Sequence, residues 1–192
     1  MSGGDKDDPI PFTPPQTRAI LRLPVVLRRM KRPITINATD YDIPYLAGYS
    51  KGGDTIYIDR DLEPFVHDGR TISTDQFLKL HEHVEKSVID ALLDSDEFDR
   101  RVLLDCLGMK APRDRVYFHA HGVATCVELF AVQGALGAVG LAAYNQFMKT
   151  QVKRAEDERI RRVPADLDMT PYAGDDVMDR RLRAAMKRAM AA

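Results

Sequence analysis

Apolar positions change their period along the chain, and the change separates a short strand region from a longer helical region. Between residues 33 and 62 apolar and polar side chains alternate, as in "IYID" at 56–59, which is the two-residue period of a half-buried strand. The pair Gly52-Gly53 precedes this run and indicates a hairpin turn. We therefore predict a small antiparallel β-layer that precedes the helices.

From residue 74 the apolar period is that of a helix. Ser73 and Gln76 have the spacing of a capping box, and the helical period then continues to residue 93. The segment 115–143 is almost entirely apolar or small, which predicts a helix buried around most of its circumference. Together these segments predict one α+β domain, with the β-layer packed on a helical core of residues 74–93 and 115–143.

Shorter features complete the expected organisation. Residues 94–108 indicate a second short helix or a continuation of the preceding one, and residues 177–190 indicate a final amphipathic helix that docks on the domain. Three glycines in 129–144 lie three residues apart, and we interpret them as positions of close helix packing rather than as a dinucleotide fingerprint. We interpret the tyrosines of 41–57 as core or sheet residues, with a substrate groove as the alternative.

A helical projection of residues 77–93 sorts the polar side chains. His81 and Glu85 fall inside the apolar arc, Glu82 falls on its edge, and His83 lies on the opposite side. The residues expected to be solvated beside His83 are Lys79, Lys86 and Asp90. A carboxylate inside an apolar arc costs several kcal/mol unless a partner neutralises it, so Glu85 and His81 require a partner.

The helix predicted at 115–143 offers such partners. His121 and Glu128 share one stripe, whereas His119 lies well round from it. Packed face to face, the two helices gather His81, Glu85, His121 and Glu128 into one cluster. Imidazole and carboxylate ligands in that number favour Zn²⁺, Mn²⁺ or Fe²⁺. The alternative is a hydrogen-bonded core network that fixes helix register without a metal.

Composition excludes few classes of function. The formal net charge of -1 gives no argument for nucleic acid or an anionic membrane surface. Two cysteines are too few for a disulfide scaffold, and the N-terminus lacks the layout of a signal peptide, so we expect a cytoplasmic protein. The apolar run 129–144 is short and interrupted by Gln133, which favours a core helix over a membrane span.

The ends of the chain differ from its middle in amino-acid composition. We predict a disordered arm at 1–17, a single domain with the proposed metal site at 18–148, and a charged helical extension at 149–192. The basic run 18–32 is interpreted as a solvated face, and contact with phosphate or an acidic partner is its alternative. The pattern does not determine the oligomeric state.

The stretch "FLKLHEHVE" at 77–85 resembles the active-site helix of zincin metallopeptidases, which carries a His-Glu-x-x-His motif. The resemblance implies that His81 is the first metal ligand, that Glu82 is the general base, and that Glu85 takes the place of the second histidine. It further implies that His121 or Glu128 completes the ligand set. The strand at "TIYIDRDL" would then be the edge strand above the site.

The resemblance implies metal-assisted hydrolysis, with a peptide or protein as the substrate. The chain also resembles small bacterial prophage proteins. The alternative function is therefore a non-catalytic, phage-associated structural or interaction protein whose buried His/Glu cluster is structural. A third hypothesis is a nucleic-acid-binding accessory that uses residues 18–32 and the C-terminal helix.

Overall fold

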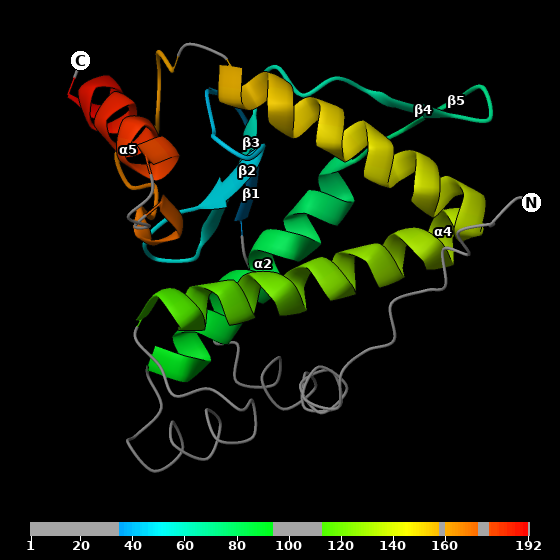
Figure 1. The fold of residues 1–192 in the computed structure, drawn as a ribbon, viewed down its shortest axis with the longest axis horizontal. Helices are drawn as coiled ribbons and strands as arrows, with labels where there is room; N and C mark the ends of the chain where they lie inside the picture. Colours follow the sequence, from blue (N-terminus) through cyan, green and yellow to red (C-terminus); the bar gives the residue numbers. More distant parts are fainter. Residues whose placement is uncertain (1–34, 94–112, 158–159, 173–176, 192) are drawn as a thin grey trace, which may run out of the picture.

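The computed structural model describes residues 35–93, 113–157, 160–172 and 177–191 (Figure 1). A three-stranded sheet contains β1 (Thr35–Tyr41), β2 (Ala47–Tyr49) and β3 (Thr55–Asp59). A separate hairpin contains β4 (Phe65–His67) and β5 (Arg70–Ile72). The helices are α2 (Asp75–Leu93), α4 (Arg113–Asp157), the 3-10 helix η1 (Thr170–Tyr172) and α5 (Val177–Met190). The predicted α+β class is confirmed.

The three-stranded sheet is mixed rather than antiparallel. Its order is β1-β3-β2; β2 and β3 form the expected antiparallel hairpin, but β1 pairs with β3 in parallel. β3 is therefore the central strand, and its predicted position at an edge of the sheet is wrong. A two-residue period identifies the residues of a strand, but it does not identify the strand's neighbours.

The outer edge of β2 is covered by a segment from the C-terminal part of the chain. The Asp168 amide donates to the Tyr49 carbonyl at 2.8 Å, and the Lys51 amide donates to the Asp166 carbonyl at 2.7 Å. Leu167, which lies between Asp166 and Asp168 in the sequence, is completely buried. The main chain at this edge of the sheet is thus already paired.

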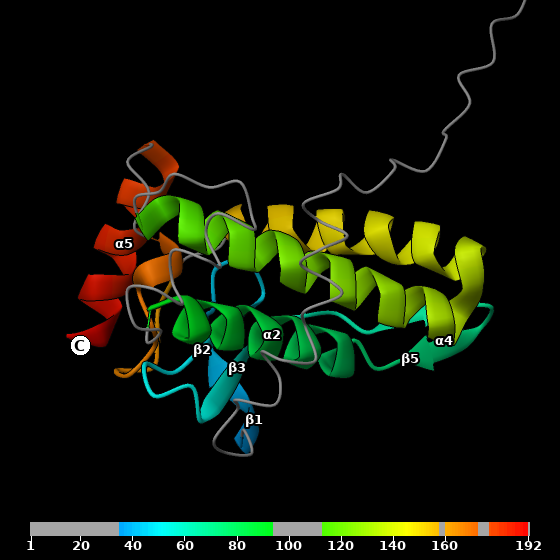
Figure 2. The ribbon, with the colours of Figure 1, turned by 90° about the horizontal axis from the view of Figure 1, so that it is seen from below.

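Helix α2 lies between the sheet and α4 (Figure 2). It begins at Asp75, and the Thr74 carbonyl accepts hydrogen bonds from the amides of Phe77 and Leu78, so the N-cap is Thr74 rather than the predicted Ser73. Its buried side chains Val84, Val88 and Ile89 pack with Ala120, Val123 and Ala124 of α4. This apolar contact holds the two helices face to face, as the sequence predicts.

Helix α4 extends beyond the predicted end at residue 143 and contains a reversal of the chain. Gly137 has φ 71° and ψ -177°, a conformation that is essentially restricted to glycine. Figure 1 shows the two arms of α4 meeting at a sharp bend and diverging from it. The predicted role of the glycines in packing holds only at Gly140, where an added Cβ would overlap the Leu136 Cβ; Gly134 and Gly137 have no such neighbour.

The expected burial of this helix is wrong over much of its length. Phe118, Phe130 and Val139 expose 69%, 76% and 76% of their surface. The segment Tyr117–Lys153 is long and apolar enough to cross a membrane by length and composition alone, and little of its apolar part is buried inside the molecule. Hydrophobic composition predicted the helix, but not which of its faces would be covered.

Helix α5 docks on the sheet side of the molecule, which confirms that prediction. Leu182 and Met186 are buried, and Met186 packs in one cluster with Leu167, Tyr172 and Tyr57. The domain boundary expected after residue 148 falls inside α4. The predicted arm 1–17, the basic run 18–32 and the short helix 94–108 lie outside the described residues.

Candidate metal centre

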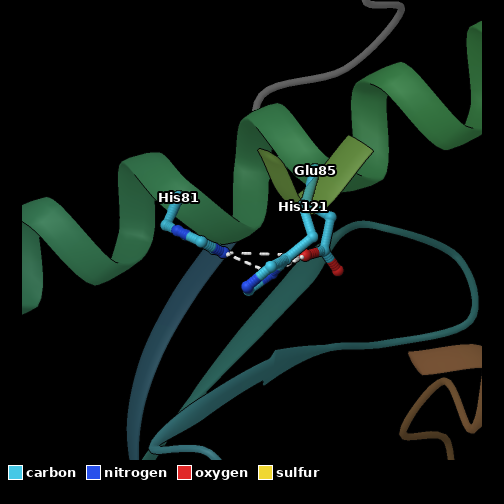
Figure 3. A group of neighbouring side chains, drawn as sticks. All are labelled: His81, Glu85 and His121. Carbon is cyan, nitrogen blue, oxygen red and sulfur yellow. Dashed lines mark hydrogen bonds and ion pairs between the residues drawn. The ribbon is translucent and has the colours of Figure 1, made fainter. Parts of the chain in front are cut away.

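Two helices bring three candidate ligands together. His81 and Glu85 are one turn apart on α2, so both side chains leave the same face, and His121 comes from the facing arm of α4. Figure 3 shows the three side chains converging. The His81 and Glu85 side chains expose 9% and 3% of their surface, whereas that of His121 exposes 48%. The cluster is therefore buried on the α2 side and open to solvent on the His121 side.

The spacing of the ligand atoms suits a single ion. His81 Nε2 lies 3.2 Å from His121 Nδ1 and 3.6 Å from Glu85 Oε2. His121 Nδ1 and Glu85 Oε2 are 2.8 Å apart. Ligands at 2.0–2.1 Å from a tetrahedral Zn²⁺ lie about 3.3 Å from one another. The observed distances bracket that value, so the group has the dimensions of a metal site.

Glu128 is brought to the cluster but faces the other nitrogen of His81. Its Oε2 lies 2.7 Å from His81 Nδ1, and its Oε1 accepts a hydrogen bond of 2.6 Å from the Tyr144 hydroxyl. Both oxygens are thus engaged on the side away from His121. The structure separates the predicted four ligands into a group of three, with Glu128 behind it as the acceptor that orients His81.

Tyr49, which the sequence predicts to be a core or sheet residue, is a member of the site. It lies on β2, exposes 1% of its surface, and donates a hydrogen bond of 3.0 Å from its hydroxyl to Glu85 Oε1. Burial and the adjacent Glu85 raise the pKa of Tyr49 well above its usual range, so the phenol keeps its proton. The only sequence signal was its position among the tyrosines of 41–57.

Charges within the cluster compensate one another. Burial by itself lowers the pKa of His81, but the contacts with Glu128 and Glu85 outweigh it and raise that pKa to about 10. Burial likewise opposes ionisation of Glu85, yet the hydrogen bond with His121 and the nearby imidazole of His81 lower its pKa. A cation is therefore favoured between these carboxylates, and a metal ion would take the place of the imidazolium proton.

Glu82 lies deeper than the helical projection predicts. It exposes only 8% of its surface, and no hydrogen bond or ion pair of its side chain occurs among the described residues. Burial raises the pKa of Glu82 to about 8 against the opposing attraction of His81, and Glu85 and Glu128 add to the rise. This carboxyl group is thus able to take up or release a proton close to neutral pH.

The opposite side of α2 also departs from the prediction. Lys86, expected in solvent, is buried, with its Nζ 2.9 Å from Asp90 Oδ1, 3.6 Å from Asp168 Oδ2 and 5.6 Å from the centre of the Tyr49 ring. The covering group Asp168 is remote in sequence, so a projection of one helix does not include it. His83 is half-buried and lies outside the three-residue group.

Comparisons with protein-family models, with curated proteins and with solved structures found no match. The chemistry of the site therefore rests on its own geometry. Two imidazoles and one carboxylate, with ligand atoms all within 4.8 Å of one another, form a group able to hold a metal ion.

Proposed function

We propose that this protein is a metal-dependent hydrolase in which His81, Glu85 and His121 hold one Zn²⁺. The observation that carries the proposal is the convergence of these three ligand atoms at a place where His121 is exposed. A catalytic zinc site has three protein ligands and keeps its fourth position for water or substrate. Mn²⁺ and Fe²⁺ accept the same donor types and are the alternative ions.

The proposed ligand set supplies the imidazole that the motif lacks. In the zincin motif the second ligand on the helix is a histidine, whereas here it is Glu85; His121, 40 residues from His81 in the sequence, restores a set of two histidines and one carboxylate. Zinc hydrolases use this same donor set. The proposed likeness to zincins therefore concerns the ligands and the helix that carries them.

Hydrolysis requires a base beside the metal-bound water, and Glu82 is the residue we propose. It follows His81 directly on α2, and its carboxyl group has no hydrogen bond or ion pair within the described part of the chain. The ion would polarise a substrate carbonyl and make its bound water more acidic, and Glu82 would accept the proton.

We propose a peptide or protein substrate, bound without addition of a strand to β2. The outer edge of β2 is paired with residues 166–168, so its main chain is not available to an extended peptide. The exposed side of His121 is the side from which a carbonyl group would approach.

Glu82→Gln tests the catalytic part of the proposal. The amide keeps the size of the side chain but is a poor base. The variant should therefore bind zinc as the wild type does, and its rate of cleavage of quenched fluorescent casein should fall by a factor of about 100 or more. Asp90→Asn is the matched control, on the same helix but outside the cluster. Equal cleavage by wild type and Glu82→Gln would refute the role of Glu82.

A second candidate function is a non-catalytic interaction protein whose cluster is structural. The specific observation in its favour is that the cluster already satisfies itself by hydrogen bonds, from His81 to Glu128 and from His121 to Glu85. The exposed Phe130 and Val139 on α4 would suit contact with a partner. This candidate predicts a stable fold that is indifferent to zinc.

A further inference from the structure

We propose that Tyr49 is a positioning residue that restricts Glu85 to coordination through one oxygen and so keeps a coordination position open. This inference rests on the proposed metal site. It concerns how many positions of the ion the protein fills, which the identity of the three ligands does not determine.

The two oxygens of Glu85 have different partners. Oε1 accepts the hydrogen bond from the Tyr49 hydroxyl at 3.0 Å, whereas Oε2 faces His121 Nδ1 at 2.8 Å and His81 Nε2 at 3.6 Å. An ion between the two histidines would therefore meet Oε2. For Oε1 to bind the same ion, the carboxylate would have to rotate away from the orientation in which Oε1 accepts the hydrogen bond of the buried Tyr49 phenol.

Tyr49 is held firmly enough to impose this orientation. Its backbone pairs with Ile56 of β3 on one side and accepts the Asp168 amide on the other. Its ring lies beneath Lys86 Nζ at 5.6 Å from the ring centre. The donor is thus carried by a strand paired on both edges, while the carboxylate is carried by a helix packed against that strand.

One-oxygen coordination has a chemical consequence. With His81 Nε2, His121 Nδ1 and a single oxygen of Glu85, the protein fills three positions and leaves the fourth on the exposed side of His121. Coordination of the ion through both oxygens of Glu85 would occupy that fourth position or block access to it. Tyr49 is thereby a residue that favours water or substrate binding without touching either.

Tyr144 provides a matched control. It is also a buried tyrosine whose hydroxyl donates to a carboxylate of the cluster, but its acceptor is Glu128, which faces the second nitrogen of His81. Tyr144→Phe therefore removes a comparable hydrogen bond without freeing an oxygen of a metal ligand.

The test is the visible absorption of Co²⁺ bound to the full-length chain, since its intensity falls as the coordination number rises from four to five. We expect an intense four-coordinate spectrum for wild type and Tyr144→Phe, and a several-fold weaker five-coordinate spectrum for Tyr49→Phe. Identical spectra for wild type and Tyr49→Phe would overturn the inference while leaving the metal site in place. Failure of the wild type to bind Co²⁺ would overturn the proposed metal site itself.

X-ray absorption at the zinc edge of the wild-type protein makes the test independent of how the variant folds. Four ligand atoms at short distance, with one carboxylate oxygen among them, are the expected result. Five ligand atoms that include both oxygens of Glu85 would overturn the role of Tyr49.

Discussion

At the residue scale, the helical period decides which of two neighbouring histidines belongs to the cluster. His81 is buried against Glu85 and Glu128, while His83, two positions later, lies outside the group, as the projection of α2 predicts. Successive residues on a helix differ by about 100°, so two positions place the side chains on opposite faces. The helical period of this segment is therefore sufficient to predict that His81, and not His83, faces the cluster.

Glu128 should affect metal affinity without being a ligand. Its Oε2 accepts from His81 Nδ1 at 2.7 Å, which orients the ring and makes Nε2 a better donor to a metal. We expect Glu128→Gln to weaken zinc binding about 10-fold to 100-fold, measured by competition with a chelating dye. His119→Ala, on the same helix but outside the cluster, should bind as the wild type does. Unchanged affinity in Glu128→Gln would show that the contact is unimportant for the site.

Other residues of the site were beyond prediction from the sequence. The position of Tyr49 opposite Glu85 depends on the packing of β2 against α2, and the burial of Lys86 depends on Asp168. Both are contacts between segments remote in sequence. The pattern of apolar and polar residues along α2 would be the same without these segments, so it does not predict which residues of β2 or of the C-terminal part pack against α2.

At the scale of elements, the two arms of α4 depend on the backbone of Gly137. The sequence contains three evenly spaced glycines, and nothing in the spacing indicates which one forms the turn. The structure places φ 71° and ψ -177° at Gly137 alone. A continuous apolar pattern across the turn is consistent with one long helix or with two shorter ones, which is why the sequence failed to predict the reversal.

Gly137→Ala should destabilise the protein, because an alanine at this backbone conformation is strained by about 1–3 kcal/mol. Gly134→Ala is the matched control: it lies in the helix, is exposed and would meet no atom within 4 Å, so it should be neutral or stabilising by up to about 1 kcal/mol. Urea denaturation of both variants measures the difference. Equal stability of the two variants would contradict the assignment of the turn.

At the scale of the whole molecule, the site connects segments that the sequence separates widely. α2 provides His81 and Glu85, α4 provides His121, and β2 provides Tyr49, whose strand is covered in turn by residues 166–168. The polar residues on the apolar faces of α2 and α4 predicted that these two helices pack face to face. The sequence did not predict the mixed sheet or the C-terminal cover, since these depend on pairing between remote segments.

Calorimetric titration of the purified chain with zinc measures whether this protein holds one transition metal ion between α2 and α4. We expect one zinc per chain for wild type and for His83→Ala, and no binding at that site for His81→Ala, because His81, unlike His83, faces Glu85 and His121. Absence of zinc binding in the wild type, or equal loss in both variants, would contradict this expectation.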